Sequence, residues 1–121
     1  MIKRHMYVIA VQNLQEAASY YQDVLGFSVR EIGDEGWRIF ERDGCQIMAG
    51  HCPDSIPPSE LGNHSYFAYI VVDDADRYCA EVSERGAELI KALKSEPWGM
   101  KEFGIRTNEG HRIMFGQDIE I

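Results

Sequence analysis

The feature that most constrains the fold of this chain is an internal repeat. The segments 43–48 (DGCQIM) and 109–114 (EGHRIM) both begin with an acidic residue and a glycine, continue as a short apolar strand, and place a methionine at the fourth position after the glycine. Upstream of each segment, an apolar run (8–11 and 69–72) leads into a helical pattern. A repeat of this length predicts two copies of one supersecondary unit.

Local signals divide each copy into the same elements. Asn13 followed by Glu16 predicts a helix N-terminus with a capping box, and Gly26 predicts the end of that helix. The second helix is predicted to begin at the acidic pair Asp73-Asp74 and to end at Gly86. Short apolar runs separated by glycine and acidic turns predict strands at 28–32, 37–42 and 45–49 in the first copy, and at 88–92, 103–107 and 111–115 in the second. Each copy is therefore a βαβββ module, and the fold class is α+β.

The chain is long enough for one domain made of both modules. A protein of 121 residues buries one core, or two small cores that share a sheet. Three prolines between 53 and 58 cannot continue a helix or a central strand. We therefore expect a single domain over 1–121, with module one at about 1–52, a linker at about 53–63 and module two at about 64–118.

Composition excludes several classes of protein. The net charge of −8 argues against a nucleic-acid surface, which needs clustered Lys and Arg; it fits a cationic ligand, although solubility alone accounts for such a charge. No apolar run approaches the ~20 residues that cross a bilayer. Three irregularly spaced cysteines indicate reduced thiols, and no signal peptide is recognisable at the N-terminus. We expect a cytoplasmic protein with no membrane or nucleic-acid partner.

Several segments resemble the vicinal-oxygen-chelate superfamily, which includes glyoxalase I, extradiol dioxygenases and bleomycin-resistance proteins. The segments 11–14 (VQNL) and 20–27 (YYQDVLGF) resemble its first-module signature, and 36–37 (GW), 51–53 (HCP) and 98–103 (WGMKEF) resemble its bleomycin-resistance branch. The resemblance implies paired βαβββ modules that form a curved mixed sheet around a cavity, commonly completed by a second subunit. It constrains function weakly, because one fold hosts many activities.

The resemblance also implies where a metal would bind. Metal-dependent members use a pair of His or Glu ligands from each module, and the equivalent positions here are Met6, Met48, Phe67 and Met114. Thioether and phenyl groups do not hold hard or borderline divalent ions, so we expect no metal and no other cofactor. Methionine in such places is a soft, adaptable packing or pocket residue.

Strand alternation predicts which side chains face the cavity. Ile47 and Ile113 belong to the apolar set that packs under the helices, whereas the opposite parity carries a mixture of apolar, aromatic and polar residues. By the same alternation His5 and His111 point away from the cavity. Aromatic and methionine side chains suit a planar or cationic ligand, and Trp98 stands out because it lies in a loop. The predicted ligand-binding residues are Trp37, Gln46, Met48, Phe67, Tyr69, Trp98, Phe103, Arg112 and Met114.

The leading hypothesis is therefore a metal-free small-molecule-binding protein of the bleomycin-resistance type. It would be a homodimer that sequesters an amphipathic ligand, which can carry positive charge, without catalysis. One alternative is a metal-dependent glyoxalase- or dioxygenase-like enzyme with displaced ligands drawn from His5, His64, Glu102 and His111. Another is a ligand-sensing or interaction module without chemistry of its own.

Overall fold

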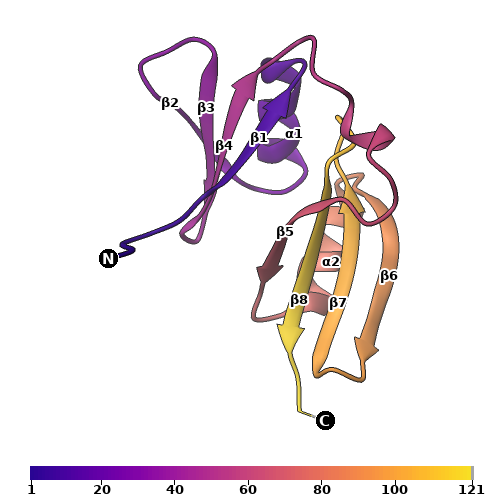
Figure 1. Cartoon of the computed structure of the whole chain (residues 1–121). Helices are drawn as coiled ribbons and strands as arrows, with labels where there is room; N and C mark the ends of the chain where they lie inside the picture. The colour runs from indigo at the N-terminus through magenta and orange to yellow at the C-terminus, as the bar shows by residue number, and fades with distance from the viewer. Residues whose placement is uncertain (121) are drawn as a thin grey trace.

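The computed structural model describes residues 1–120 and contains two helices, one short 3₁₀ helix and eight strands. Their order follows the duplication (Figure 1). Module one contains β1 (Tyr7–Val11), α1 (Leu14–Asp23), β2 (Ser28–Glu31), β3 (Trp37–Arg42) and β4 (Cys45–His51). The 3₁₀ helix η1 (Pro58–Glu60) lies in the connection, and module two contains β5 (Tyr66–Val71), α2 (Ala75–Glu84), β6 (Glu88–Glu96), β7 (Met100–Arg106) and β8 (Arg112–Asp118).

Each module forms its own four-stranded mixed sheet. The strand orders are β1-β4-β3-β2 and β5-β8-β7-β6, so the two sheets have the same topology. In each sheet the first strand is parallel to the last, and the other pairs are antiparallel. The repeated segments form equivalent strands, in which Met48 pairs with Val8 and Met114 pairs with Tyr69. The turns before them differ in length, because residues 43–44 join β3 to β4 and residues 107–111 join β7 to β8. The α+β fold of two tandem βαβββ modules is thus confirmed.

The helix caps agree with the sequence in most respects. The Asn13 Oδ1 atom accepts a hydrogen bond from Glu16 N at 3.0 Å, and the Asp74 Oδ1 atom accepts one from Arg77 N at 2.9 Å. The expected return bond of the capping box is not made by Glu16. The backbone N–H of Asn13 instead donates to Glu109 of module two at 2.7 Å, so a residue distant in sequence completes this cap.

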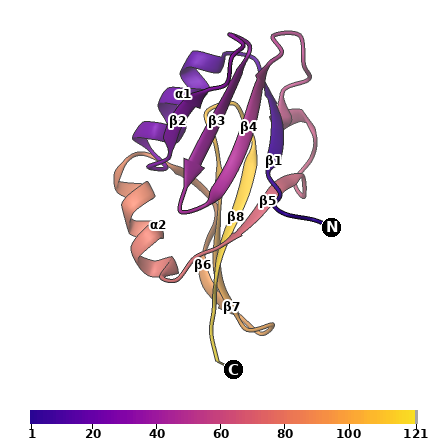
Figure 2. The ribbon, with the colours of Figure 1, turned by 90° about the vertical axis from the view of Figure 1, so that its left-hand side faces the viewer.

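One face of each sheet is covered by the helix of its own module. In module one, Tyr21 of α1 stacks on Phe40 of β3 with ring centroids 4.5 Å apart. In module two, Tyr78 of α2 contacts both Phe103 and Phe115, which stack on each other at 5.2 Å. The buried residues of both modules form one continuous core, and the two helices lie on the same side of the molecule in Figure 2. Neither helix has the length and apolar character needed to cross a membrane.

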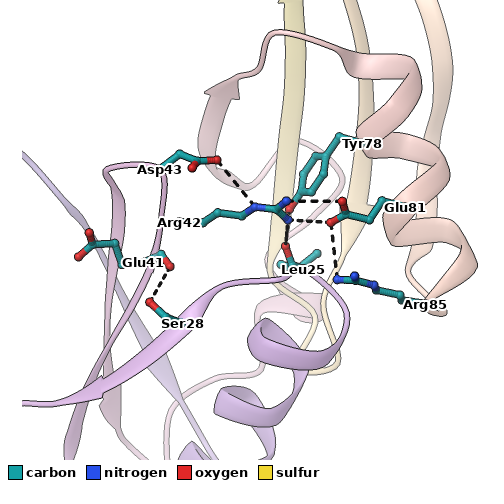
Figure 3. A network of polar contacts seen from close by, with 8 residues as sticks. All are labelled: Leu25, Ser28, Glu41, Arg42, Asp43, Tyr78, Glu81 and Arg85. Carbon is teal, nitrogen blue, oxygen red and sulfur yellow. Dashed lines mark hydrogen bonds and ion pairs between the residues drawn. The ribbon is translucent and has the colours of Figure 1, made fainter.

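Several polar contacts join the modules, and those of Glu109 and Arg42 form two groups. Glu109, in the turn before β8, accepts backbone hydrogen bonds from Gln12 and Asn13 at the start of α1, both at 2.7 Å. Arg42, at the end of β3, forms an ion pair of 2.7 Å with Glu81 of α2 and donates to the Leu25 carbonyl oxygen at 2.9 Å (Figure 3). The guanidinium also lies 5.1 Å from the centre of the Tyr78 ring. These contacts hold the modules together beside the shared core.

Candidate functional site

Strand alternation leaves each sheet with one face that its helix does not cover, which we call the helix-free face. On β4, Ile47 and Ala49 are buried in the core, so Gln46 and Met48 lie on the helix-free face. Trp37 lies on the same face, because a Cβ atom added to Gly50 would meet its ring at 2.8 Å. On β8, Ile113 and Phe115 are in the core, so Arg112 and Met114 lie on the helix-free face of module two.

The first strand of module two departs from simple alternation. Its register with β8 shifts between Tyr66 and Ala68, which makes Phe67 an extra residue in the strand. The Phe67 ring packs at the core, 5.9 Å from the Tyr7 ring and 5.7 Å from the His111 ring. This corrects the expected placement of Phe67, and the helix-free face receives the ring of Tyr66 instead.

Two glycines make room for tyrosine rings on this face. A Cβ atom added to Gly104 would lie 3.1 Å from the Tyr66 hydroxyl, and one added to Gly116 would lie 2.7 Å from Cζ of Tyr69. Strand glycines commonly mark such close approach. Tyr66 is not among the predicted ligand-binding residues, and Gly104 is the feature of the sequence that indicates its position.

Phe103 also lies elsewhere than expected. It is fully buried and packs against Tyr78 of α2, on the helix-covered face of β7. Its neighbours Glu102 and Gly104 therefore occupy the helix-free face. Phe103 is therefore a core residue. The alternation of Phe103 and Ile105 with Glu102 and Gly104 is the sequence pattern that indicates this placement.

A buried carboxylate organises the helix-free face of module two. Glu102 is only 4% exposed and accepts hydrogen bonds from Tyr69 Oη at 2.6 Å and Lys91 Nζ at 2.7 Å. Trp98 Nε1 lies 3.5 Å from the same carboxylate, and Lys91 lies 5.9 Å from the centre of the Trp98 ring. A second buried acid, Glu96, has its carboxylate 3.4 Å from Lys91 Nζ. We call these five residues, Tyr69, Lys91, Glu96, Trp98 and Glu102, the acidic cluster.

The electrostatics of the acidic cluster favour binding over proton transfer. Burial opposes ionisation of Glu102, but the hydrogen bonds from Lys91 and Tyr69 outweigh it, so the pKa of this carboxyl lies below its usual value. Burial, followed by the hydrogen bond to Glu102, raises the pKa of the Tyr69 phenol above its usual value. At neutral pH an ionised carboxylate and a neutral phenol are therefore both held firmly. Neither has a pKa near 7, where general acid–base catalysis is most effective.

Three exposed aromatic side chains lie among the predicted ligand-binding residues, Trp98 and Tyr69 in the acidic cluster and Trp37 on the helix-free face of module one. Trp98 is 60% exposed in the turn between β6 and β7, Tyr69 is 41% exposed, and Trp37 is 36% exposed. Gln46 donates to the Glu41 carboxylate at 2.8 Å, and it shares a hollow of about 210 Å³ with Tyr69. That hollow, which His5 and Tyr7 also line, brings predicted residues of the two modules together.

Arg112 lies at the other end of the module-two face. It is 5% exposed, and its Nη1 atom donates to the Gly62 carbonyl oxygen and to Ser65 Oγ. Across the strand pair it is directly opposite Arg106, which forms an ion pair of 3.1 Å with Glu88. The predicted residue Arg112 is thus a buried cation that also holds the connection before β5.

A cleft of about 420 Å³ lies between the modules on the helix side, beside the ion pair drawn in Figure 3. Its walls include Arg42, Tyr78, Glu81 and the acidic pair Asp73 and Asp74. None of the nine predicted ligand-binding residues lines it. The hydrogen bond with Arg42 is the main reason why the pKa of the Glu81 carboxyl is lowered, so the pair remains ionised at neutral pH.

The residues at the four positions where the resemblance predicts metal ligands do not fit a metal ion. Met48 and Met114 lie on the helix-free faces of two different sheets, Met6 precedes β1, and Phe67 packs at the core. Thioether and phenyl groups are poor ligands for Zn²⁺, Ni²⁺, Fe²⁺ or Mn²⁺. Within residues 1–120, no three His, Cys, Asp or Glu side chains are grouped so as to hold an ion.

The residues proposed as displaced ligands are dispersed. His5 and His64 are exposed in the N-terminal segment and the connection, respectively. Glu102 is bonded within the acidic cluster, and His111 is buried at the core beside Phe67. These positions do not form one coordination site.

Comparisons with solved structures support the same fold. TioX from Micromonospora sp. ML1 is 22% identical, with 98% of each chain covered and a TM-score of 0.73. The bleomycin resistance determinant encoded on transposon Tn5 is 18% identical, with 97% of this chain and 98% of that chain covered and a TM-score of 0.79. A bleomycin-binding protein complexed with bleomycin is 17% identical, with 97% and 99% covered and a TM-score of 0.78.

No curated protein matches the sequence. The sequence does match the family model described as the Glyoxalase/Bleomycin resistance protein/Dioxygenase superfamily, over residues 3–115. This match spans both modules, including both repeated segments and the acidic cluster. The chain therefore belongs to the glyoxalase/bleomycin resistance protein/dioxygenase superfamily.

Proposed function

We propose that this chain is a metal-free small-molecule-binding protein of the bleomycin-resistance type. It binds an amphipathic ligand that can carry positive charge, and it acts by sequestration, lowering the free concentration of the ligand without covalent change. The observation that carries the proposal is the chemistry of the helix-free faces. They present aromatic rings, methionines and firmly bonded polar groups, whereas their metal-ligand positions carry no suitable donors.

The exposed aromatic rings supply the binding surface. Trp98 and Tyr69 lie within hydrogen-bond distance of the buried carboxylate of Glu102, which gives that region a negative potential. A cation is attracted both to an aromatic face and to a carboxylate beneath it. Two of the structurally similar proteins are a bleomycin resistance determinant and a bleomycin-binding protein, which makes sequestration a reasonable mode of action.

We further propose that the protein is a cytoplasmic homodimer. Each sheet leaves one face without a helix, and Val8 and Val71 are exposed on the edge strands β1 and β5. A second copy would cover apolar area there and enclose the ligand in a groove. The measurement is light scattering of the purified protein; a monomer at micromolar concentration contradicts the dimer.

The experiment for ligand binding is a fluorescence titration. A panel of planar amphipathic compounds, cationic and neutral, is added to the protein while tryptophan emission is recorded. We expect saturable quenching by cationic members and a weaker response in Trp98→Ala, because Trp98 is the tryptophan that lies beside the buried carboxylate of Glu102. Trp37→Phe is measured in parallel, since it removes the other tryptophan, on the helix-free face of module one, and so shows which of the two sheets carries the response. Absence of any saturable change across the panel contradicts the proposal.

A further inference from the structure

The helix-free face of module two carries opposite charges at its two ends. Glu102 and Arg106 are four residues apart on β7, which puts both on this face, about 13 Å apart along the strand. Arg112 is directly opposite Arg106 on the neighbouring strand. Gly104 and Met114 lie midway between the charged ends, with the rings of Tyr66 and Tyr69 packed over the strand glycines.

The negative end has more buried acid than buried base. Glu96 and Glu102 are both less than a tenth exposed, and one partly buried ammonium, that of Lys91, contacts both. The second ammonium near Glu96 belongs to Lys94, which is 70% exposed and 3.8 Å away, so solvent screens it. The acidic cluster therefore keeps about one uncompensated negative charge.

The positive end has the opposite imbalance. Within residues 1–120, Arg112 has no carboxylate within 4.0 Å, and both of its hydrogen bonds are made by Nη1, which leaves Nη2 and Nε available. Its cross-strand neighbour Arg106 has one acidic partner, the exposed Glu88. Like charges directly opposite each other in a sheet are destabilising, and a buried charge is costly unless it is paired. An anion at this end would relieve both effects.

We propose that this face binds a zwitterionic (amphoteric) small molecule, with its cationic group at the acidic cluster and its anionic group at Arg112. The two charges of the ligand are about 13 Å apart, and a flat or apolar middle lies over Tyr66, Met114 and Tyr69. Planar hydrogen bonding suits guanidinium to a carboxylate or a phosphate group. This inference rests on the proposed ligand-binding function and specifies the ligand class of the same site.

The test uses three tetrapeptides that lack tryptophan. Phe-Ala-Ala-Phe with free ends carries an ammonium and a carboxylate about 13 Å apart when extended. Its C-terminal amide keeps the cation alone, and its N-acetyl form keeps the anion alone. Affinities are measured by isothermal titration calorimetry at pH 7 and low salt. We expect the peptide with free ends to bind about tenfold more tightly than either capped peptide, as is usual for one charge-assisted contact.

Two variants assign the ends. In Arg112→Gln the free peptide and its amide should bind equally, while the preference over the acetylated peptide remains. In Glu96→Gln the free peptide and its N-acetyl form should bind equally, while the preference of the free peptide over its amide remains. Arg30→Gln, an exposed arginine on module one, is the control and should bind as the parent does. Because Arg112 also holds the connection before β5, the melting temperature of the Arg112→Gln variant is recorded. If that variant does not fold, Arg106→Gln is used in its place.

The outcomes separate the two proposals. If all three peptides bind with equal affinity, the amphoteric assignment fails while small-molecule binding stands. If Arg112→Gln and Arg106→Gln both fold and leave the preference for the free carboxylate unchanged, the anionic end is wrongly placed. If neither the peptides nor the amphipathic panel bind saturably, both proposals fail. The expected pattern in parent and variants supports both.

Discussion

Gly116→Ala is the substitution that most sharply tests the arrangement on the helix-free face of module two. The backbone φ angle of Gly116 is not in the left-handed region, so alanine is allowed there, and the loss of a strand glycine by itself should stabilise the protein by about 0.5–1 kcal/mol. The added Cβ atom, however, would lie 2.7 Å from Cζ of Tyr69. The ring must move, and its hydrogen bond to Glu102 must break.

The expected magnitude follows from that hydrogen bond. A bond to a charged acceptor contributes about 1.5–3 kcal/mol, and the gain from replacing glycine offsets part of the loss. We expect Gly116→Ala to lower the free energy of unfolding by about 1–2 kcal/mol. Urea unfolding followed by tryptophan fluorescence, at fixed protein concentration, measures this difference.

A double-mutant cycle with Tyr69→Ala makes the test specific. Without the tyrosine ring, Gly116→Ala should be neutral or slightly stabilising, which gives a large coupling between the two sites. Gly36→Ala is a matched control, because its nearest neighbour is a single side-chain oxygen of Asp34 at 3.2 Å. A Gly116→Ala variant as stable as the parent, or equally destabilised in the absence of Tyr69, would refute the reasoning.

Three further predictions concern contacts at the core and between the modules. Burial lowers the pKa of His111 below its usual 6.5, so the unfolded chain binds a proton at a higher pH than the folded chain does. The free energy of unfolding should therefore be undiminished above pH 6.5 and should decrease as the pH falls below 6.5. His111→Gln should reduce the difference in stability between pH 7 and pH 5, as measured by urea unfolding. Glu109→Gln removes a charged acceptor from two backbone N–H groups and should cost about 1–2 kcal/mol in the same assay; an unchanged midpoint contradicts its capping role. The Arg42 and Glu81 side chains are each about one-third exposed, so solvent screens their ion pair. A double-mutant cycle with Arg42→Met and Glu81→Gln should therefore give a coupling free energy of only about 0.5–1 kcal/mol, which decreases in 1 M NaCl. A coupling free energy unaffected by salt would contradict the screened ion pair.

The parts of the fold that repeat in the sequence could be predicted from it. The acidic-Gly turns at 43–44 and 109–110, the caps at Asn13 and Asp74, and the alternation in β4 and β8 are local signals, and the structure agrees with each. These signals are local because hydrogen bonds within a turn or cap involve residues three or four apart.

Features that depend on the partner strand were harder to predict. The register shift at Phe67 arises from the pairing of β5 with β8, and no turn residue marks it. The strand β6 extends to Glu96, beyond the expected end at residue 92, with two register shifts of its own. A single extra residue reverses the facing of those that precede it, so Tyr66 rather than Phe67 reaches the helix-free face.

The polar site was only partly visible in the sequence. Tyr69, Trp98 and Arg112 were expected at the site, but the buried pairing of Glu102 with Lys91 joins residues on β7 and β6 whose register is irregular. The capping of α1 by Glu109 is likewise a contact between modules, about a hundred residues apart in the chain. Such contacts depend on how the two modules pack, which local patterns do not encode.

The most direct test of the account is the metal content of the protein, purified without chelators, together with its ligand affinity before and after treatment with EDTA. Since the expected metal-ligand positions carry Met6, Met48, Phe67 and Met114, we predict far less than one metal ion per subunit and an unchanged affinity. One tightly held Ni, Zn, Fe or Mn ion per subunit, with binding lost on its removal, would contradict the metal-free account.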